Sequence, residues 1–392
     1  MSEDILIERE EVLNSLLEEI GKQKDPRINR CKRFSLGEIF FLVLNAQICG
    51  YETFREYEAY GQLKLSFLKR FLPYKKGSPS RSTIARVLAF FDPKHLEKLF
   101  IEWMKKIVSL EATKTLENDQ GVVAIDGKTH CGARGEEKLH LVSAFDTNSG
   151  LILGEEKVQD KSNEITAIPL LLDSLAVQGN LISIDAMGCQ IAIAEKIISK
   201  GADYLLALKG NQGLLLEDVR DYFESKDCLK NCDVVTRVDK GHGRIEKRTC
   251  YTTNDINWID KKSDWIGFKS IVMVIAERTI NGKLTVEKRF YISSVKSDPV
   301  RLLLATRAHW GIENSLHWVL DVIFGEDNRI IWNQNIAQNE SIIRRIALNL
   351  LKKYRLTMPT KSAKSEKIAL KTLRKILSHD DEKMFKLLQA GF

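Results

Sequence analysis

No run of apolar residues in this 392-residue sequence approaches the roughly 20 residues that a membrane-spanning helix requires. The first residues, MSEDILIEREEVLNSLLEEI, are acidic and amphipathic. They lack the basic and apolar segments that make up a secretory signal peptide. The sequence therefore predicts a cytoplasmic protein that has no membrane partner.

Paired cysteines are also missing. The seven cysteines are scattered along the chain, their number is odd, and no two of them form a C-x2-C pair. A disulfide framework or a zinc ribbon would show regular cysteine spacing. We therefore expect ordinary reduced thiols.

An excess of acidic residues is absent as well, since the net charge is +7. Residues 340–392 carry thirteen Lys and Arg against five Asp and Glu, so the positive charge is concentrated there. A basic segment favours a polyanionic partner. The alternative is a helical face that only contacts solvent.

Hydrophobic periodicity divides the chain into parts of different character. Ser35 and Glu38 form a capping-box signature before a helical pattern. Further on, Asn281-Gly282 lies between alternating strands and is typical of a type I′ hairpin turn. We predict a helical N-terminal domain over 1–115, a catalytic domain over 116–355 with a β-rich insertion at about 215–300, and a basic helical tail over 356–392.

The stretch GSPSRSTIARVLAFFDP predicts a helix in the N-terminal domain. Its apolar residues Ile84, Val87 and Leu88 recur at helical spacing, which leaves Arg81 and Arg86 for another face. This pattern is typical of the second helix of a helix-turn-helix, which enters the DNA major groove. The alternative is a helical hairpin that packs on its neighbours.

From residue 122 onward the pattern predicts three strands, a helix, a strand, a helix and a fifth strand. Short connections allow the first three strands to form an antiparallel meander. The last two strands follow crossover helices and should run parallel to the first. This order predicts an α/β fold with a ribonuclease-H-like mixed sheet.

Two of the predicted strands end in an acid. Asp126 follows the buried strand in VVAIDGK, and Asp185 ends the strand in ISIDAM. Because open α/β sheets bind ligands at the carboxyl ends of parallel strands, adjacent strands would place both carboxylates at one site.

A third acid lies in HWGIENSLHWVLDVI. On a helical wheel, Glu313 falls at the border of the apolar face, next to His309, Trp310 and His317. Groups that can donate to a phosphate therefore surround it. The spacing His309-x3-Glu313-x3-His317 could alternatively bind zinc. The two aspartates favour a harder ion, Mg²⁺ or Mn²⁺.

Long ordered motifs over residues 25–355 closely resemble the H-repeat-associated family of bacterial insertion-sequence transposases, which are DDE transposases. The segments that carry the resemblance are VVAIDGK, LHLVSAFDTNSGLILGEEKV, KSNEITAIPLLLDSL, ISIDAMGCQIAIAEKI, DYLLALKGNQ, HGRIE and HWGIENSLHWVLDVIFGED. The family implies a ribonuclease-H-like fold with an all-β insertion between the second Asp and the Glu.

The resemblance also implies the chemistry. Asp126, Asp185 and Glu313 match the three metal-binding acids, which would hold two Mg²⁺ or Mn²⁺ ions. Two-metal sites activate an attacking oxygen and stabilise a leaving oxygen. The implied reaction is hydrolysis at the element ends, followed by attack of the freed 3′-hydroxyl on target DNA. The implied assembly is a homodimer on double-stranded DNA, associated with the nucleoid.

One departure concerns the Tyr-x2-Arg-x3-Glu-x6-Lys signature of wider relatives, where this chain has Thr306, His309 and Leu320. His309 could take over phosphate contact from the arginine. The residues expected to bind DNA are Arg81, Arg86, Lys128, Lys209, His242, Arg244, Arg307, His309, Trp310 and His317. A solvated β-turn around Arg244 and a buried Trp310 are the alternatives. At the level of function, the alternatives are a nuclease or resolvase and a non-catalytic DNA-binding descendant.

Overall fold

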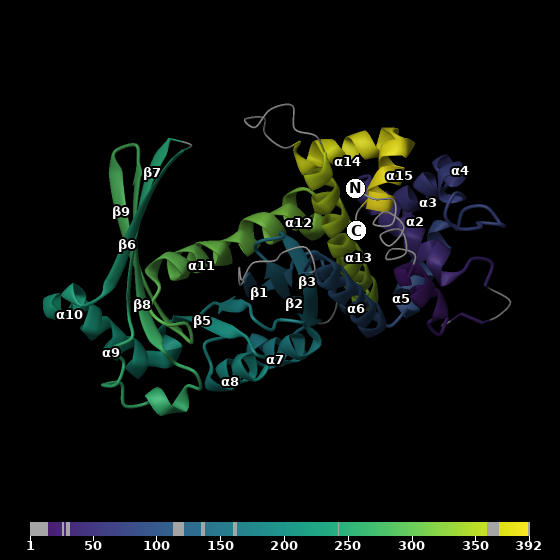
Figure 1. Ribbon diagram of the computed structural model, residues 1–392. Helices are drawn as coiled ribbons and strands as arrows, with labels where there is room; N and C mark the ends of the chain where they lie inside the picture. The colour runs from purple at the N-terminus through teal and green to yellow at the C-terminus, as the bar shows by residue number, and fades with distance from the viewer. Residues whose placement is uncertain are drawn as a thin grey trace.

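The computed structural model describes residues 15–25, 27–28, 32–112, 121–134, 138–159, 163–241, 243–358 and 368–390. A nine-stranded mixed sheet runs through the molecule, with N-terminal and C-terminal helices gathered at one end and a strand-rich arm at the other (Figure 1). None of the described helices is both long and apolar enough to cross a membrane. The six described cysteines are free thiols.

The core of the sheet has the strand order that the sequence predicts. Its strands lie in the order β3-β2-β1-β4-β5, with β1–β2 and β2–β3 antiparallel and β1–β4 and β4–β5 parallel. Their bounds are β1 Val122–His130, β2 Leu139–Asp146, β3 Leu151–Lys157, β4 Leu181–Ile184 and β5 Asp203–Leu208. The meander and the two parallel crossovers are therefore confirmed.

Helices cover both faces of this core. Helices α7 (Glu164–Ser174) and α8 (Ile191–Ser199) lie on one face, and α11 (Pro299–Ile312) lies on the other (Figure 1). All four residues of the central strand β4 are buried, as its apolar sequence LISI requires between two helical layers. The sheet therefore has a fixed edge at which its strand ends meet.

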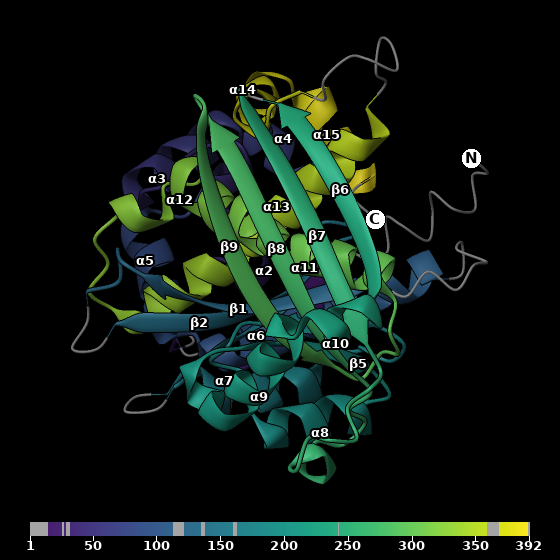
Figure 2. The same ribbon diagram turned by 90° about the vertical axis from the view of Figure 1, so that its left-hand side faces the viewer.

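The insertion is strand-rich, as predicted, but it is not a separate body. After α9 (Gly213–Glu224) and α10 (Lys226–Lys230), four strands form an antiparallel arm that we call the wing. They are β6 Asp233–Gly241, β7 Arg244–Thr253, β8 Ser270–Ile280 and β9 Lys283–Ser293. Strand β9 pairs with β5, so the wing continues the core sheet (Figure 2). The predicted turn is present, with φ of 48° at Asn281 and 77° at Gly282.

The N-terminal region is helical, as predicted. Its helices are α2 Leu36–Ile48, α3 Phe54–Leu63, α4 Leu65–Leu68, α5 Arg81–Phe90 and α6 Pro93–Ala112. The capping box is formed, because the Glu38 amide donates to Ser35 Oγ at 3.1 Å and the Ser35 amide donates to Glu38 Oε2 at 2.7 Å. Every residue of α2 is buried. Its partner helix comes from the other end of the chain.

That partner is α13 (Gln334–Thr357), which packs against α2, α5, α6 and β3 and is followed by α14 (Leu370–His379) and α15 (Asp381–Ala390). Several basic residues of the positively charged stretch 340–392 are buried here. Arg344 and Arg345 are each 1% exposed, and Arg374 is 5% exposed. These three charges hold the fold together instead of forming a solvated face, so the excess charge of this segment is less available to a polyanion than its sequence suggests.

Candidate active site

The register of the sheet places Asp126 and Asp185 side by side at its edge. Strands β1 and β4 pair from Val122 opposite Leu181 as far as Ile125 opposite Ile184. Asp126 and Asp185 are the next residues on their strands, so each carboxylate leaves the sheet where the parallel pairing ends. The sequence prediction of a shared edge is therefore confirmed.

A tight turn orients Asp185. Its Oδ1 accepts hydrogen bonds from the backbone amides of Met187 at 3.0 Å and Gly188 at 3.4 Å. A Cβ at position 188 would lie 2.3 Å from Ile184 Cγ2, so glycine allows the turn to close over the strand end. The carboxylate is thus fixed by local backbone geometry.

Glu313 reaches the same edge from the helix that crosses the sheet. Helix α11 ends at Ile312 and continues through a π-helical turn, Glu313–His317, into α12 (Trp318–Val322). The Trp318 amide donates to the Glu313 carbonyl, five residues earlier. Such single π-turns occur often at functional sites. The extra residue in this turn changes which side chains face the sheet.

The turn brings His317 between two acids. Its Nδ1 lies 3.4 Å from Glu313 Oε2 and 3.7 Å from Asp126 Oδ2, and one ligand atom from each of the three residues lies within 4.8 Å of the others. The His317 side chain is 7% exposed, and its Nε2 has no hydrogen-bond partner in the described part of the chain. Burial lowers the pKa of His317, which favours the neutral, ligand-competent ring.

These donors fit a divalent cation. Burial, together with the charges of Glu313 and Asp185, raises the pKa of Asp126 to about 7. Crowded carboxylates of this kind repel each other until a cation neutralises them. Two acids and a neutral imidazole are ordinary metal ligands. Asp185 is near enough for its charge to act on Asp126, but it is not a member of this close group.

The other histidine of the predicted zinc spacing is not in this group. The zinc hypothesis requires His309, Glu313 and His317 to lie together. Among the described residues, Glu313 and His317 instead form a close group with Asp126. His309 lies on the Asp185 side, where burial lowers its pKa while the Asp185 charge and the Ser183 carbonyl act in the opposite direction. A zinc site on the helix alone therefore loses one of its ligands.

Two predicted DNA-binding residues of α11 contact the wing. Trp310 is 47% exposed, and the Arg289 guanidinium lies 4.4 Å from the centre of its ring. Arg307 forms an ion pair with Asp239 of β6. Trp310 is therefore not buried, contrary to the alternative considered from sequence.

Other predicted contacts are spread over the molecule. Lys128 is largely buried, and its ammonium contacts Asp321, Glu326 and Asp327. The exposed basic residues are Lys209 at the end of β5, Arg244 at the tip of the wing, and Arg81 and Arg86 on α5. His242 lies outside the described residues. DNA binding by each of these residues stays a prediction, and Lys128 would have to leave its carboxylates to contribute.

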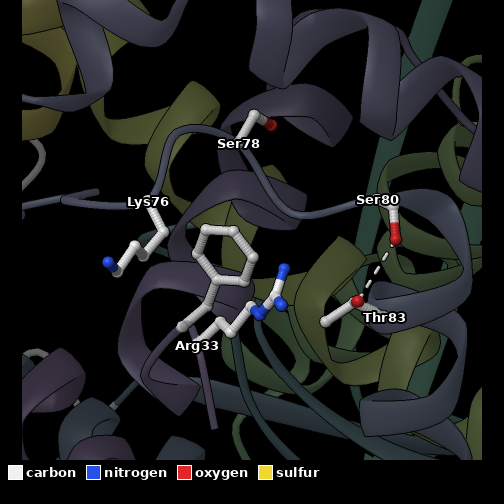
Figure 3. Close-up of a pocket in the computed structure, with 6 residues that line it drawn as sticks. Arg33, Lys76, Ser78, Ser80 and Thr83 are labelled. Carbon is white, nitrogen blue, oxygen red and sulfur yellow. Dashed lines mark hydrogen bonds between the residues drawn. The ribbon is translucent and has the colours of Figure 1, made fainter. Parts of the chain in front are cut away.

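A pocket of about 550 Å³ opens at the start of α5, and none of the candidate metal ligands lines it (Figure 3). It is lined by Arg33, Phe34, Lys76, Ser78, Ser80 and Thr83. Ser80 and Thr83 share a hydrogen bond of 3.2 Å at the start of the helix. The lining contains two cations and no acid. The apolar residues of α5 are buried as predicted, so its basic residues project from the body of the domain.

Carboxylates on adjacent parallel strands, with another from a crossing helix, are an arrangement typical of metal-dependent hydrolytic or transfer centres. The model of the family "Transposase DDE domain" matches residues 109–350, and that of "DDE_Tnp_1-associated" matches residues 17–104. The chain therefore belongs to the DDE transposase family. Membership implies a DNA-cleaving enzyme that uses divalent metal ions.

Relatives agree over nearly the whole chain. "Putative transposase YncI" of Escherichia coli O157:H7 is 39% identical over 370 residues, which span 92% of this chain and 93% of the relative. "H repeat-associated putative transposase YhhI" of Escherichia coli strain K12 is 38% identical over 354 residues, which span 86% of this chain and 90% of the relative. The resemblance noted from the motifs is confirmed.

Proposed function

We propose that this protein is the transposase of an insertion sequence. It cleaves DNA phosphodiesters at the element ends and then joins the freed 3′-hydroxyl to target DNA, on a sheet of ribonuclease-H-like type. The observation that carries the proposal is the gathering of Asp126, Glu313 and His317 within 4.8 Å in a chain of the DDE transposase family.

The residues have separable tasks. Asp126, Asp185 and Glu313 would hold two Mg²⁺ or Mn²⁺ ions, whose charge activates an attacking oxygen and stabilises a leaving one. The charges of Glu313 and Asp185 both act on Asp126, so Asp126 would be the ligand shared by the two ions. Water attacks first, and the freed 3′-hydroxyl attacks second at the same place, since only the attacking oxygen differs. Trp310, which is 47% exposed, would stack on a displaced base through the ring face that Arg289 does not cover.

DNA would bind beyond the acids as well. The Arg81 end of α5, with the basic pocket next to it, suits the sequence-reading role of the N-terminal region. The wing extends from the carboxylates and carries exposed arginines. Pairing two element ends requires two copies of the chain, so a homodimer on DNA and nucleoid association belong to the proposal.

The test uses purified protein, duplex DNA carrying an element end, and Mn²⁺ or Mg²⁺. Asp126→Asn, Asp185→Asn and Glu313→Gln should each abolish cleavage and spare DNA affinity, because they remove a charge that holds metal. Asp173→Asn, which changes an exposed acid of α7, serves as the matched control. Cleavage by Asp126→Asn or Asp185→Asn at near the wild-type rate would contradict the assignment.

The products separate the alternatives. Nicks together with joined strands support a transposase, whereas nicks without joining indicate a nuclease or resolvase. DNA binding without any cleavage would indicate a non-catalytic descendant. Metal analysis of the purified protein adds a second check, because one tightly bound zinc per chain would overturn the Mg²⁺ interpretation of the Glu313 helix.

A further inference from the structure

A further acid, Glu164, lies next to the strand that carries Asp126, on the side of the sheet that α7 covers. Glu164 opens α7, and its Oε1 lies 2.8 Å from His140 Nε2. His140 Nδ1 in turn lies 2.8 Å from Thr129 Oγ1. Thr129 and His140 are opposite each other in the β1–β2 ladder, so they share one face of the sheet. The three side chains form a continuous chain that ends in a carboxylate.

Glycine at position 127 brings this carboxylate against the backbone next to Asp126. A Cβ at Gly127 would lie 2.1 Å from Glu164 Oε1 and 2.8 Å from His140 Nε2. Real Cβ atoms do not approach other atoms so closely, so any side chain at 127 would displace Glu164. Strand β1 has already passed the end of β4 at this point, which leaves the sheet edge open.

Fold stability alone does not account for an acid at this position. The Glu164 side chain is 13% exposed, and its carboxylate lies against Gly127, the residue that follows Asp126. Helix α7 already has a cap, because Asn163 Oδ1 accepts from the Ile165 amide at 3.1 Å. Placing a carboxylate near other acids costs free energy unless a cation is shared.

We propose that Glu164 is a fourth carboxylate of the metal centre, oriented by His140, which Thr129 orients in turn. The inference rests on the proposed function. Glu164 Oε2 has no hydrogen-bond partner among the described residues, so it is available to a divalent cation held at the edge of the sheet. His140 and Thr129 are positioning residues, since they act through Glu164.

The first test measures Mn²⁺ binding to the DNA-free, full-length protein by isothermal titration calorimetry. Glu164→Gln keeps the shape and a hydrogen bond to His140 but removes the charge, so Mn²⁺ affinity should fall on the order of tenfold. Glu195→Gln on α8 makes the same change at an exposed site and should leave affinity unchanged. Thr129→Val should give a smaller loss than Glu164→Gln.

The second readout is the Mn²⁺ concentration that gives half-maximal cleavage, which should rise in Glu164→Gln and not in Glu195→Gln. A purely structural role would lower the melting temperature but leave the Mn²⁺ affinity of the folded protein unchanged, and that result overturns the proposal.

If Glu164→Gln does not fold, His140→Gln leaves the charge of Glu164 in place and removes the ring that orients it. Weaker Mn²⁺ binding then supports the proposal, and unchanged binding overturns it. Wild-type protein that neither binds Mn²⁺ nor cuts DNA would overturn the proposed function, and this inference with it.

Discussion

Lys352 is a buried charge that lies away from the carboxylates. Its Nζ donates to the Gly150 carbonyl at 2.8 Å and lies 4.5 Å from the centre of the Phe145 ring. Burial lowers the pKa of Lys352 from 10.5 to about 7. The native state therefore carries the cost of an incompletely solvated ammonium at neutral pH.

This residue makes a prediction for stability as a function of pH. Between pH 7 and 10.5 the unfolded chain holds a proton that native Lys352 has released, so its contribution to the free energy of unfolding rises with pH. This contribution to stability is fully present above about pH 10.5, the pKa of a lysine in the unfolded chain, and is lost as the pH falls toward 7. Urea denaturation from pH 7 to 10 should show a steeper rise for wild type than for Lys352→Met. Lys371→Met, at an exposed lysine of α14, should follow wild type. Parallel curves for wild type and Lys352→Met would contradict the prediction.

The residues of the candidate site differ in how far sequence could place them. Asp126 and Asp185 were predictable together, because each follows an apolar run and the two runs pair in parallel, although β1 continues past Asp126 to His130. Glu313 was placed at the border of the apolar face by a regular helical wheel. The position of His317 was not predictable in this way, because the wheel assumes 3.6 residues per turn and the π-turn adds one. The position of Glu164 near the site was not predictable, because its partners His140 and Thr129 lie on other elements.

Among the elements, the wing presents two chemically different faces. In an antiparallel ladder, directly opposed residues share a face. The face toward α11 carries five arginines, Arg237, Arg244, Arg248, Arg278 and Arg289. It also carries three acids, Asp239, Glu246 and Glu287, which pair with all of these arginines except Arg237. The opposite face carries three lysines, one acid and five exposed aliphatic residues, Lys240, Lys247, Lys288, Glu277, Val234, Val238, Ile245, Leu284 and Val286. The arginine face contacts Trp310 through Arg289.

This asymmetry predicts that DNA follows only the arginine face. The double variant Arg237→Gln, Arg278→Gln should weaken binding to end DNA and reduce the slope of log affinity against log salt by roughly 1.8, at about 0.9 per lost phosphate contact. The double variant Lys240→Gln, Lys288→Gln removes the same charge from the other face. It should change neither the affinity for end DNA nor the salt slope. Fluorescence anisotropy over a salt series measures both. An equal loss from the two faces would show that the wing acts only through its net charge.

The order of the strands along the chain was more predictable than the way in which they pair in the sheet. Alternating patterns and the Asn281-Gly282 turn identified the strands of the insertion, because these signals are local. The pairing of β9 with β5 was not predicted, because the hydrophobic pattern of a strand does not indicate which other strand it pairs with. The strand-rich insertion was therefore predicted, whereas its continuation of the core sheet through β9 was not.

Across the whole molecule, buried ion pairs join the catalytic sheet to the terminal helices. Arg345 pairs with Glu155 of β3 and, at 3.2 Å, with Glu326, and all three side chains are 1% exposed. Arg344 pairs with Glu340 at 3.2 Å in the same interior. Even with Arg345 present, burial raises the pKa of Glu155 to about 7. The network is therefore sensitive to the loss of any cation.

Arg345→Met should lower the free energy of unfolding by about 3–5 kcal/mol, because it leaves the buried Glu155 without its partner and removes one of the cations around the buried Glu326, which keeps Lys128 and Arg344. Lys230→Met breaks the fully exposed pair with Asp227 and should cost about 1 kcal/mol or less. Chemical denaturation of the two variants beside wild type measures the difference. Similar losses would mean that solvent reaches the interior pairs.

The packing of α2 on α13 has a consequence for synthesis on the ribosome. These two helices lie nearly 300 residues apart in the chain, yet each covers apolar surface of the other. At about 5–20 residues per second, α13 is made some 15 to 60 seconds after α2. During that interval α3 and α5 can pack on α2, but the apolar surface of α2 that α13 covers in the finished protein has no partner. A chain stopped anywhere before α13 keeps that surface exposed, so it is a substrate for chaperones and proteases, and only complete translation releases a protein able to act on DNA.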